Sequence, residues 1–260
     1  MQEQKIIRKV TRIGNGAHIF APKEWVDSEV VVTLVPRTDV KEEIIDLLYP
    51  HLNKINGVFL YGSYARNEQR KESDIDVLVI AKEKFKVSKP GFDIIVIKDE
   101  DIEKAIKTNP ILMYSIIKES KPILNPSLLD NLKKIKINKK VFSEFIKSTK
   151  LNIITNREII ELDKQLNNSY ASSGVIYSLI LRLRGIFIIN SLIKSKSYSN
   201  ELFEKWLISQ VKGLNYSLIY EVYQAIRDDN KIKHKISIND VNVLLSLLEK
   251  ETEKLEKIIK

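Results

Sequence analysis

Residues 60–80 read LYGSYARNEQRKESDIDVLVI, and this stretch decides the fold. An apolar run ends at Gly62 and Ser63, a polar loop follows, and a second apolar run begins with Asp74 and Asp76. Short apolar runs bounded by turn residues are typical of buried strands, so the stretch predicts a strand, a loop and a second strand. Because side chains alternate along a strand, we expect the two aspartates on the same face.

The residues of this stretch predict a phosphate-binding and metal-binding site. Two carboxylates side by side repel one another, and divalent cations between them remove that repulsion; oxygen ligands favour Mg²⁺ or Mn²⁺. Gly62 lets backbone N–H groups approach a phosphate, the Ser63 hydroxyl adds a donor, and the guanidinium of Arg66 can bind phosphate oxygens. Together these groups predict a site for a metal-bound nucleoside triphosphate.

The segments around this stretch predict an α/β domain with a third acid. Residues 91–98, GFDIIVIK, predict a further strand that carries Asp93, and we expect it beside the strand of the aspartate pair. A lone acid in such an apolar run suits a third metal ligand or a general base for an incoming hydroxyl. The other expected strands are residues 57–62 and 74–81. Helices are expected over residues 39–50, capped by Asp39, and after residues 99–101.

The ordered set GSYAR, SDIDVLV and FDIIVI resembles the DNA polymerase β-type nucleotidyltransferase superfamily, particularly its minimal branch. The resemblance covers about residues 40–125. It implies a two-metal enzyme that transfers a nucleoside monophosphate, AMP from ATP, to an acceptor and releases pyrophosphate. The acceptor could be a protein, an RNA end or a small hydroxylated molecule.

The resemblance also implies a role for each matching residue. The expected metal ligands and catalytic residues are Asp74, Asp76 and Asp93, with Asp93 facing the acceptor. The expected nucleotide-binding residues are Gly62, Ser63, Arg66 and Ser73, with the first two on the β- and γ-phosphates. Many family members have glycine after the arginine, where this chain has Asn67. Because asparagine tolerates a positive φ, we expect the loop to keep its shape.

The N-terminal segment predicts a small β module over residues 1–37. Short β patterns flank the turn Gly14-Asn15-Gly16, and the run from Arg8 to Val35 resembles AbrB/MazE-type swapped-hairpin modules. That resemblance implies a homodimer, because about forty residues bury too little surface alone. It also raises DNA binding, and dimerisation is the favoured role. The candidate DNA-binding residues are Lys5, Arg8, Lys9 and Arg12.

The segment after the predicted catalytic domain (residues 38–130) predicts an all-α bundle over residues 138–260. Its final helix has an apolar stripe after Asn239 as cap; the stripe consists of Val241, Leu244, Leu245, Leu248, Leu255, Ile258 and Ile259. The bundle resembles those of kanamycin-type nucleotidyltransferases and HEPN proteins. The overall fold class is therefore α+β, with a mixed sheet between the β module and the bundle.

Several polar residues of the bundle have open interpretations. Arg182 and Arg184 could bind a phosphate, or one could pair with Glu221 or another acid. Arg227 and His234 have a spacing like that of HEPN ribonucleases, although chance is the favoured explanation. A bundle carboxylate could act as the base, and the candidates are Glu144, Glu158 and Glu161.

Composition and charge exclude several classes of protein. The chain has no cysteine, which excludes disulfides, thiolate zinc sites and a cysteine nucleophile. Residues 131–260 hold 23 basic and 14 acidic side chains, which equals the whole net charge of +9. Its lysine clusters could attract phosphates or simply form a solvated surface.

The sequence predicts a cytoplasmic protein without a membrane segment. The first residues lack the apolar core of a secretory signal, and Arg182 and Arg184 interrupt the most apolar stretch, residues 175–193. That stretch is expected to be a buried helix of a soluble bundle. The alternative to an enzyme is an antitoxin-like regulatory protein that binds a toxin or operator DNA.

Overall fold

The computed structural model describes residues 10–30, 32, 40–71, 73–211 and 213–260 of the chain. The chain divides into two compact units, residues 1–43 and residues 44–260. Helix α1 (Val40–Leu48) begins in the first unit and ends in the second. Each unit is described by itself.

The described part of the first unit is a small β hairpin. Strands β1 (Thr11–Ile13) and β2 (Gly16–His18) pair antiparallel around Gly14, whose φ of +52° suits a tight turn, and a 3₁₀ turn η1 (Lys23–Trp25) follows. Residues 10–30 and 32 contain no buried residue. Most of the last predicted β segment of the module, and Lys5, Arg8 and Lys9, lie outside the described residues.

The second unit contains the mixed sheet expected from the sequence, and the α+β fold class is confirmed. Four strands lie in the order β5-β4-β3-β6. Their bounds are β3 Ile55–Tyr61, β4 Ile75–Ala81, β5 Phe92–Lys98 and β6 Lys121–Leu124. Strand β3 pairs antiparallel with both β4 and β6, whereas β4 and β5 are parallel. The central strands β3 and β4 are almost wholly buried, as continuous apolar runs require.

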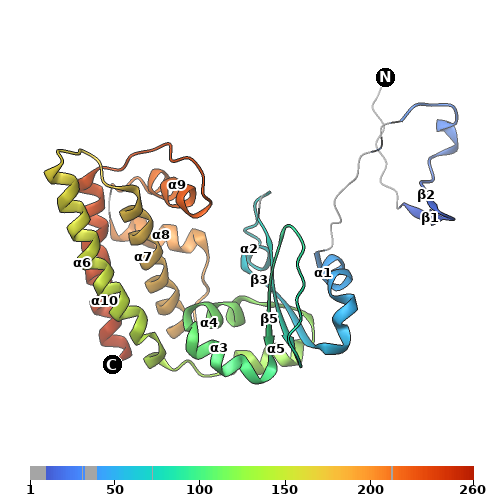
Figure 1. The fold of residues 1–260 in the computed structure, drawn as a ribbon, viewed down its shortest axis with the longest axis horizontal. Helices are drawn as coiled ribbons and strands as arrows, with labels where there is room; N and C mark the ends of the chain where they lie inside the picture. The colour runs from blue at the N-terminus through green and yellow to red at the C-terminus, as the bar shows by residue number, and fades with distance from the viewer. Residues whose placement is uncertain (1–9, 31, 33–39, 72, 212) are drawn as a thin grey trace. The chain divides into compact units, whose positions relative to one another are not determined.

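Short helices surround this sheet (Figure 1). They are η2 (Tyr49–Lys54), α2 (Gly62–Arg66), η3 (Asp99–Asp101), α3 (Ile102–Thr108), α4 (Pro110–Glu119) and α5 (Pro126–Lys133). Helices α4 and α5 pack against β3, and α3 packs against β5. Strand β6 was not predicted, because KPIL is short and contains a proline, which is tolerated at a sheet edge.

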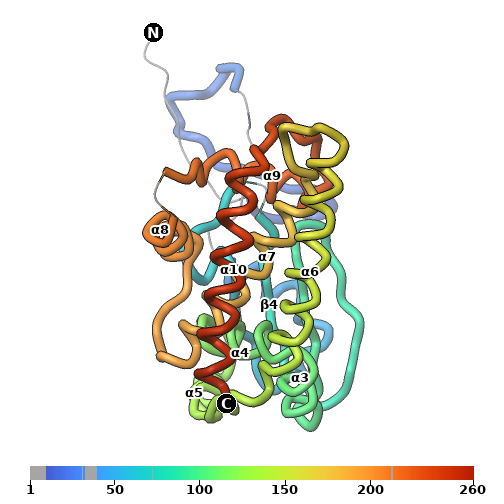
Figure 2. The backbone as a smooth tube through the Cα atoms, turned by 90° about the vertical axis from the view of Figure 1, so that its left-hand side faces the viewer, coloured from blue at the N-terminus to red at the C-terminus, as the bar shows by residue number. Residues whose placement is uncertain are grey.

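From residue 140 onward the chain is helical, as predicted. After η4 (Lys139–Phe142) come α6 (Ser143–Gln165), α7 (Ser173–Ile193), α8 (Asn200–Gln210), α9 (Tyr216–Arg227) and α10 (Ile238–Ile259). Helices α6 and α10 lie side by side, and α7 packs against both (Figure 2). Helix α7 also packs against α4, so the bundle joins the sheet region through that pair of helices.

Helix α7 is long and apolar enough to cross a membrane, and half of its most apolar window is buried inside the structure. Gly185 explains its close packing on α6, since a Cβ there would lie 2.5 Å from the Phe145 ring. We interpret α7 as the core helix of the bundle, and the cytoplasmic location stays a prediction.

The final helix corrects two details of the sequence analysis. Its N-cap is Ser237, not Asn239: the Asp240 N–H donates to Ser237 Oγ at 3.1 Å, and the Ser237 hydroxyl donates to the Asp240 carboxylate at 2.7 Å. Ile258, predicted on the buried stripe, is 37% exposed, whereas the next residue, Ile259, is buried. The other residues of the predicted stripe are buried.

Candidate active site

Strand β3 leads directly into a tight loop built on α2. Gly62 has a φ of +69°, and Asn67 ends the helix in the left-handed conformation with a φ of 58°. The Glu68 N–H donates to the Ser63 carbonyl at 2.8 Å and closes the turn. The expectation for Asn67 is therefore confirmed: asparagine takes the left-handed conformation that glycine would otherwise supply. We call residues 62–68 the nucleotide loop.

Gly62 lies in direct contact with the carboxylate of Asp76. A Cβ built on this glycine would lie 1.8 Å from Asp76 Oδ2, so no other residue fits without moving the aspartate. The backbone N–H of Ser63 donates to the same carboxylate, and the Gly62 N–H donates to Glu119 Oε1 at 3.0 Å. The backbone N–H groups of Gly62 and Ser63, which were expected near a phosphate, thus donate to carboxylates. The contact between Gly62 and Asp76 joins the loop to strand β4.

The structure brings Asp76 and Asp93 together. They are register partners on the parallel strands β4 and β5, so their side chains leave the same face of the sheet. Burial first, and the charge of Asp93 second, raise the pKa of Asp76 to about 6. Tyr61, the register partner of Asp76 on β3, has its pKa raised by burial and by Asp93, Asp76 and Glu119. Acidic side chains therefore converge around the end of β3.

The third predicted metal ligand does not complete a cluster. Asp74 is exposed and precedes the first residue of β4. Within the described ranges of the chain, no three His, Cys, Asp or Glu side chains form a group that could hold a metal ion. The donor set that the structure does gather is the pair Asp76 and Asp93. Two adjacent carboxylates, of which Asp76 has its pKa raised by burial and by the charge of Asp93, suit a divalent cation with oxygen ligands.

Ser73 holds the loop before β4. Its hydroxyl accepts from the Arg70 N–H at 2.8 Å, and its own N–H donates to the Arg70 carbonyl at 3.0 Å. These two bonds close a turn just before Asp74. Ser73 is thus placed to order the loop that leads to the aspartates, and its expected role in nucleotide binding stays a prediction.

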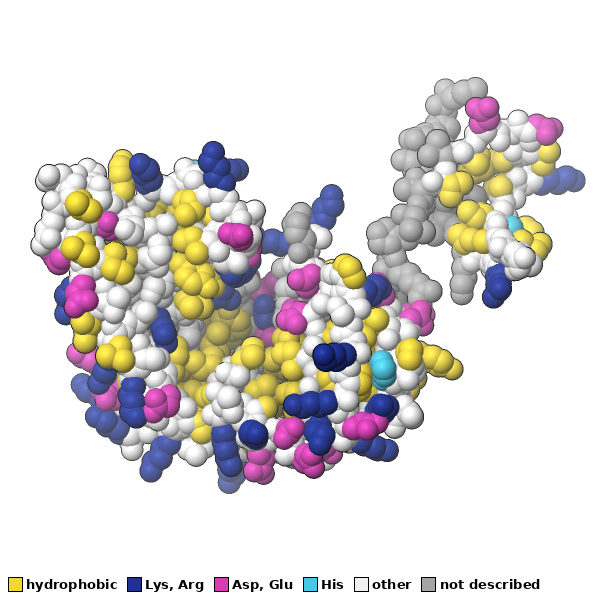
Figure 3. Space-filling view, viewed as in Figure 1, with side chains coloured by type: hydrophobic (Ala, Val, Ile, Leu, Met, Phe, Trp, Pro, Cys, Tyr) yellow, Lys and Arg dark blue, Asp and Glu magenta, His cyan; other side chains and the backbone are white. Residues whose placement is uncertain are grey.

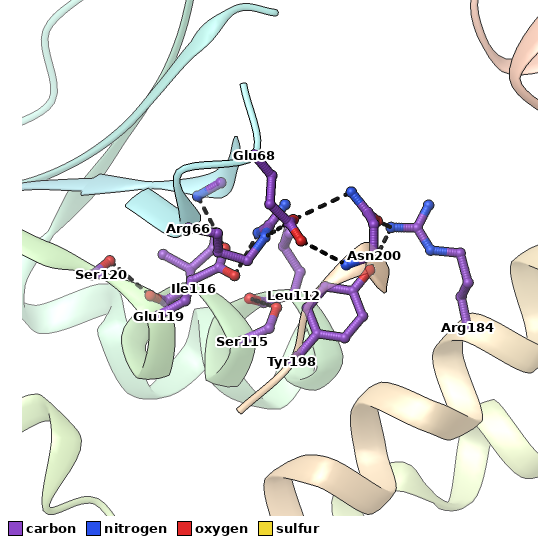
Figure 4. Close-up of polar contacts among 11 residues, drawn as sticks. Arg66, Glu68, Leu112, Ser115, Ile116, Glu119, Ser120, Arg184, Tyr198 and Asn200 are labelled. Carbon is purple, nitrogen blue, oxygen red and sulfur yellow. Dashed lines mark hydrogen bonds and ion pairs between the residues drawn. The ribbon is translucent and has the colours of Figure 1, made fainter. Parts of the chain in front are cut away.

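Arg66 is held between two carboxylates that sequence reasoning did not identify. Its Nε lies 2.8 Å from Glu68 Oε2, and its Nη1 lies 2.6 Å from Glu119 Oε2 (Figure 4). Its side chain is 16% exposed. Glu68 follows the motif by two residues and could have been considered from its position, whereas Glu119 ends α4 and belongs to no recognisable motif. Its role depends on the packing of α4 beneath the loop.

The contacts of Arg182 and Arg184 show whether either arginine pairs with an acid of the bundle. Arg184 donates to the hydroxyls of Tyr198 and Tyr223 and to the side-chain oxygen Oδ1 of Asn200. It forms no ion pair with any described residue. Arg182 donates to the Ser148 hydroxyl at 2.9 Å. The pairing of an arginine with Glu221 is wrong, because Glu221 binds His234 at 2.9 Å.

Three other candidate residues of the bundle, Arg227, Glu144 and Glu161, form ion pairs on the surface. Arg227 binds its neighbour Asp228 through two hydrogen bonds of 2.6 and 2.9 Å. Glu144 and Glu161 pair with lysines three residues further along α6. These contacts give none of them a position in the site, and their catalytic roles stay predictions.

Comparison with known proteins decides the family. Residues 42–128 match the model of the polymerase beta nucleotidyltransferase family. Two relatives from Methanocaldococcus jannaschii, both named "Putative protein adenylyltransferase", are 37% identical over 92 residues and 35% identical over 86 residues. The chain spans 89% and 88% of these relatives, which correspond to 35% and 28% of its own length. The chain belongs to the polymerase beta nucleotidyltransferase family.

The segment matched by the family model contains all four strands of the mixed sheet and the whole nucleotide loop of this nucleotidyltransferase. It also contains Asp74, Asp76, Asp93 and Glu119. The superfamily and the general reaction expected from the sequence, nucleotidyl transfer, are thereby confirmed. The bundle and the N-terminal hairpin lie outside the match.

Solved structures similar to this nucleotidyltransferase include three with low identity. A spectinomycin adenyltransferase from Enterococcus faecialis is 14% identical, with 82% of this chain and 97% of that chain covered and a TM-score of 0.43. A nucleotidyltransferase-like protein from Exiguobacterium sibiricum is 10% identical, covering 83% and 75%, with a TM-score of 0.39. A toxin-antitoxin structure with AMP-PNP is 18% identical, covering 36% and 81%, with a TM-score of 0.27.

Proposed function

We propose that this nucleotidyltransferase transfers AMP from ATP to a protein hydroxyl, with Mg²⁺ (or Mn²⁺) as cofactor. The observation that carries the proposal is the register pair Asp76 and Asp93, which lies directly against Gly62 of the nucleotide loop. The names of the two archaeal relatives support the adenylyl group and the protein acceptor. RNA ends and small hydroxylated molecules are the other acceptors considered from the sequence.

In the proposed reaction the acceptor oxygen attacks the α-phosphorus of ATP. A new P–O bond forms to the acceptor, the bond between the α-phosphorus and the bridging oxygen breaks, and pyrophosphate leaves with that oxygen. The acceptor proton passes to a base, for which we propose the exposed carboxylate of Asp93. The Ser63 hydroxyl and Nη2 of Arg66 would bind the β- and γ-phosphates.

Asp76 and Asp93, joined by Asp74, would hold the metal. Bound metal ions would supply charge neutralisation of the phosphates and of the departing pyrophosphate. The contribution of the chain is to keep the carboxylates adjacent and rigid on two paired strands, while Gly62 leaves room for the Asp76 side chain. Two ions, as expected from the family resemblance, remain part of the proposal.

The test uses ATP labelled at the α-phosphate, with Mg²⁺ and a cell extract. Label is expected in protease-sensitive material, from ATP in preference to the other triphosphates, and its incorporation is expected to stop with EDTA. ATP labelled at the γ-phosphate is the matched control, and with it the added enzyme should give no label in protein beyond that of the extract alone, whose kinases also use this label. Transfer of the γ-label, or α-label found only in RNA or small molecules, would contradict the proposed reaction or its acceptor.

We further propose that residues 1–37 form a homodimer. Apolar side chains of the described hairpin unit are exposed, including Phe20 at 72% and Val26 at 67%. Two short strands without a buried residue cannot stabilise a domain alone. A second copy of the same segment offers the complementary apolar surface that the swapped-hairpin resemblance implies. DNA binding by Arg12, and the antitoxin-like alternative, stay predictions.

Deleting residues 1–36 is therefore expected to convert the protein from a dimer to a monomer. The apolar surface that would hold the two copies together is then absent, while residues 44–260 keep their own core. Light scattering of the deleted and full-length chains gives the mass directly. A milder variant, Phe20→Ser, should weaken the dimer at low protein concentration. A truncated chain that still has the dimer mass would place the interface in residues 44–260.

A further inference from the structure

We infer that Glu119, Glu68 and Asn200 are positioning residues that set the shape of the nucleotide loop. Glu119 acts from α4, Glu68 from the end of the loop itself, and Asn200 from the helical bundle. With Arg66 and Arg184 they form one continuous chain of hydrogen bonds, the Arg66 relay (Figure 4). The inference rests on the proposed function, since it assigns residues that would hold the nucleotide-binding loop in place.

The first link of the relay is Glu119, which binds both ends of α2. One carboxylate oxygen accepts from the Gly62 N–H at 3.0 Å, and the other accepts from Arg66 Nη1 at 2.6 Å. Helix α2 has only five residues, which is too short for a helix to be stable by itself. The carboxylate of Glu119 therefore helps to fix the first and last residues of the loop's helix.

The second link joins the loop to the bundle through Glu68. Its Oε1 accepts from the backbone N–H of Asn200 at 3.0 Å, and its Oε2 accepts from Asn200 Nδ2 at 3.3 Å and from Arg66 Nε at 2.8 Å. Asn200 is the first residue of α8, where the helix dipole favours a carboxylate. A residue 132 positions further along the chain thus binds the end of the nucleotide loop.

The third link anchors Asn200 inside the bundle. Its side-chain amide oxygen Oδ1 accepts from Arg184 Nη2 at 3.0 Å, and Arg184 also donates to the Tyr223 hydroxyl on α9 at 3.0 Å. The Tyr198 ring lies 5.5 Å from the Arg66 guanidinium and 6.0 Å from that of Arg184, a distance typical of cation–π contact. Helices α7, α8 and α9 all contribute to the position of Asn200.

The charges of the relay indicate why Arg66 is held so firmly. Two carboxylates bind one guanidinium through Nε and Nη1, and the contacts with these two carboxylates do not use Nη2. In Figure 3 the surface of residues 44–260 is hollowed between the bundle and the sheet region, with acidic and basic side chains on its rim. The relay joins the nucleotide loop to α7 and α8 through Asn200, so the position of the loop depends on the packing of the bundle.

The test is a double-mutant cycle between Glu68 and Asn200. Glu68→Ala and Asn200→Ala are each expected to raise the Kd of a non-hydrolysable ATP analogue about tenfold, since each removes a hydrogen bond to a charged group. Because Asn200 contacts the loop through Glu68, the double variant should be weakened by about the same factor as Glu68→Ala alone, not by about a hundredfold. In turnover assays the KM for ATP should rise in parallel while kcat stays within about threefold.

Glu201→Ala is the matched control, because Glu201 is the next residue of α8 and, among the described residues, pairs only with the exposed Lys205. It should leave the Kd unchanged. Additive losses in the double variant, an unchanged Kd in either single variant, or an equal loss with Glu201→Ala would overturn the relay. Analogue binding by calorimetry needs no turnover, so a protein that binds the analogue but transfers no AMP would disprove the proposed function and leave the relay testable.

Asn200→Asp provides a second variant in case truncation disturbs folding. It keeps the size of the side chain and the backbone N–H but places a carboxylate against Glu68. Its Kd should rise at least as much as that of Asn200→Ala, at an unchanged melting temperature. A Kd equal to that of the unmodified protein would contradict the coupling.

Discussion

Replacing Asp76 with asparagine is expected to reduce nucleotidyl transfer by at least about a hundredfold, because the variant loses a carboxylate at the point where metal and phosphates would meet. Asparagine has the same shape and can still accept from the Ser63 N–H. The loss should therefore appear as a lower kcat in a folded protein. Pyrophosphate release measures the effect, and Asp130→Asn, at an exposed position on α5, is the control.

The same substitution is expected to stabilise the metal-free protein at about pH 8. Burial and Asp93 raise the pKa of Asp76 from 3.8 to about 6 in the folded state. Near pH 4 the carboxyl is protonated in the folded state and about half protonated in the unfolded state, so it costs only about 0.5 kcal/mol, and this cost disappears at lower pH. As the pH rises through 6, the folded state must hold an unfavourable charge, and the cost approaches about 3 kcal/mol. Asparagine removes this cost.

Urea unfolding in EDTA at about pH 4 and about pH 8 checks this sign. The gain of Asp76→Asn over the unmodified protein should appear at the higher pH and be much smaller at the lower one. Equal gains at both values would mean that charge repulsion is not the cause. A variant with full turnover would refute the assignment of Asp76 as a metal ligand.

Gly62→Ala is expected to be the most damaging single change in the nucleotide loop. The added Cβ would lie 1.8 Å from Asp76 Oδ2, and the residue must also keep a φ of +69°. Strain and the displaced carboxylate together should lower the free energy of unfolding by about 2–4 kcal/mol. Because Asp76 is pushed away from Asp93, transfer should fall at least about a hundredfold.

Gly213→Ala separates the backbone strain from the contact. Gly213 has a φ of +82°, and a Cβ there would meet nothing within 4 Å. It should cost only about 1–2 kcal/mol and leave transfer unchanged. Thermal unfolding and pyrophosphate release on both variants give the comparison. Equal behaviour of the two variants would mean that the contact between Gly62 and Asp76 has no special importance.

The sequence alone predicted the central strands and the adjacency of two acids. Apolar runs bounded by polar loops are enough to locate β3 and β4, because a strand buried on both faces needs a continuous apolar run. The same kind of run locates β5, which is the half-buried strand at the edge of the sheet. The conformation of the loop at Asn67 was also predictable, since the tolerance of asparagine for a positive φ is a property of the residue itself. Local chemistry also carried the family resemblance, which depends on residues close together in the chain.

Other features were decided only by the tertiary structure. Strand β6 forms because β3 offers a free edge, not because KPIL favours a strand.

The nucleotide loop shows the division most clearly. Its glycine, serine and aspartates were recognisable in the sequence, but the groups that hold it were not. Glu119 is 57 residues from Gly62, and Asn200 is 132 residues from Glu68. A carboxylate on a helix end has no sequence pattern that names its partner, since hydrogen bonds between distant segments exist only once the helices have packed. The residues expected to do the chemistry can therefore be recognised from a short stretch of sequence. The residues that hold them in position are known only from the tertiary structure.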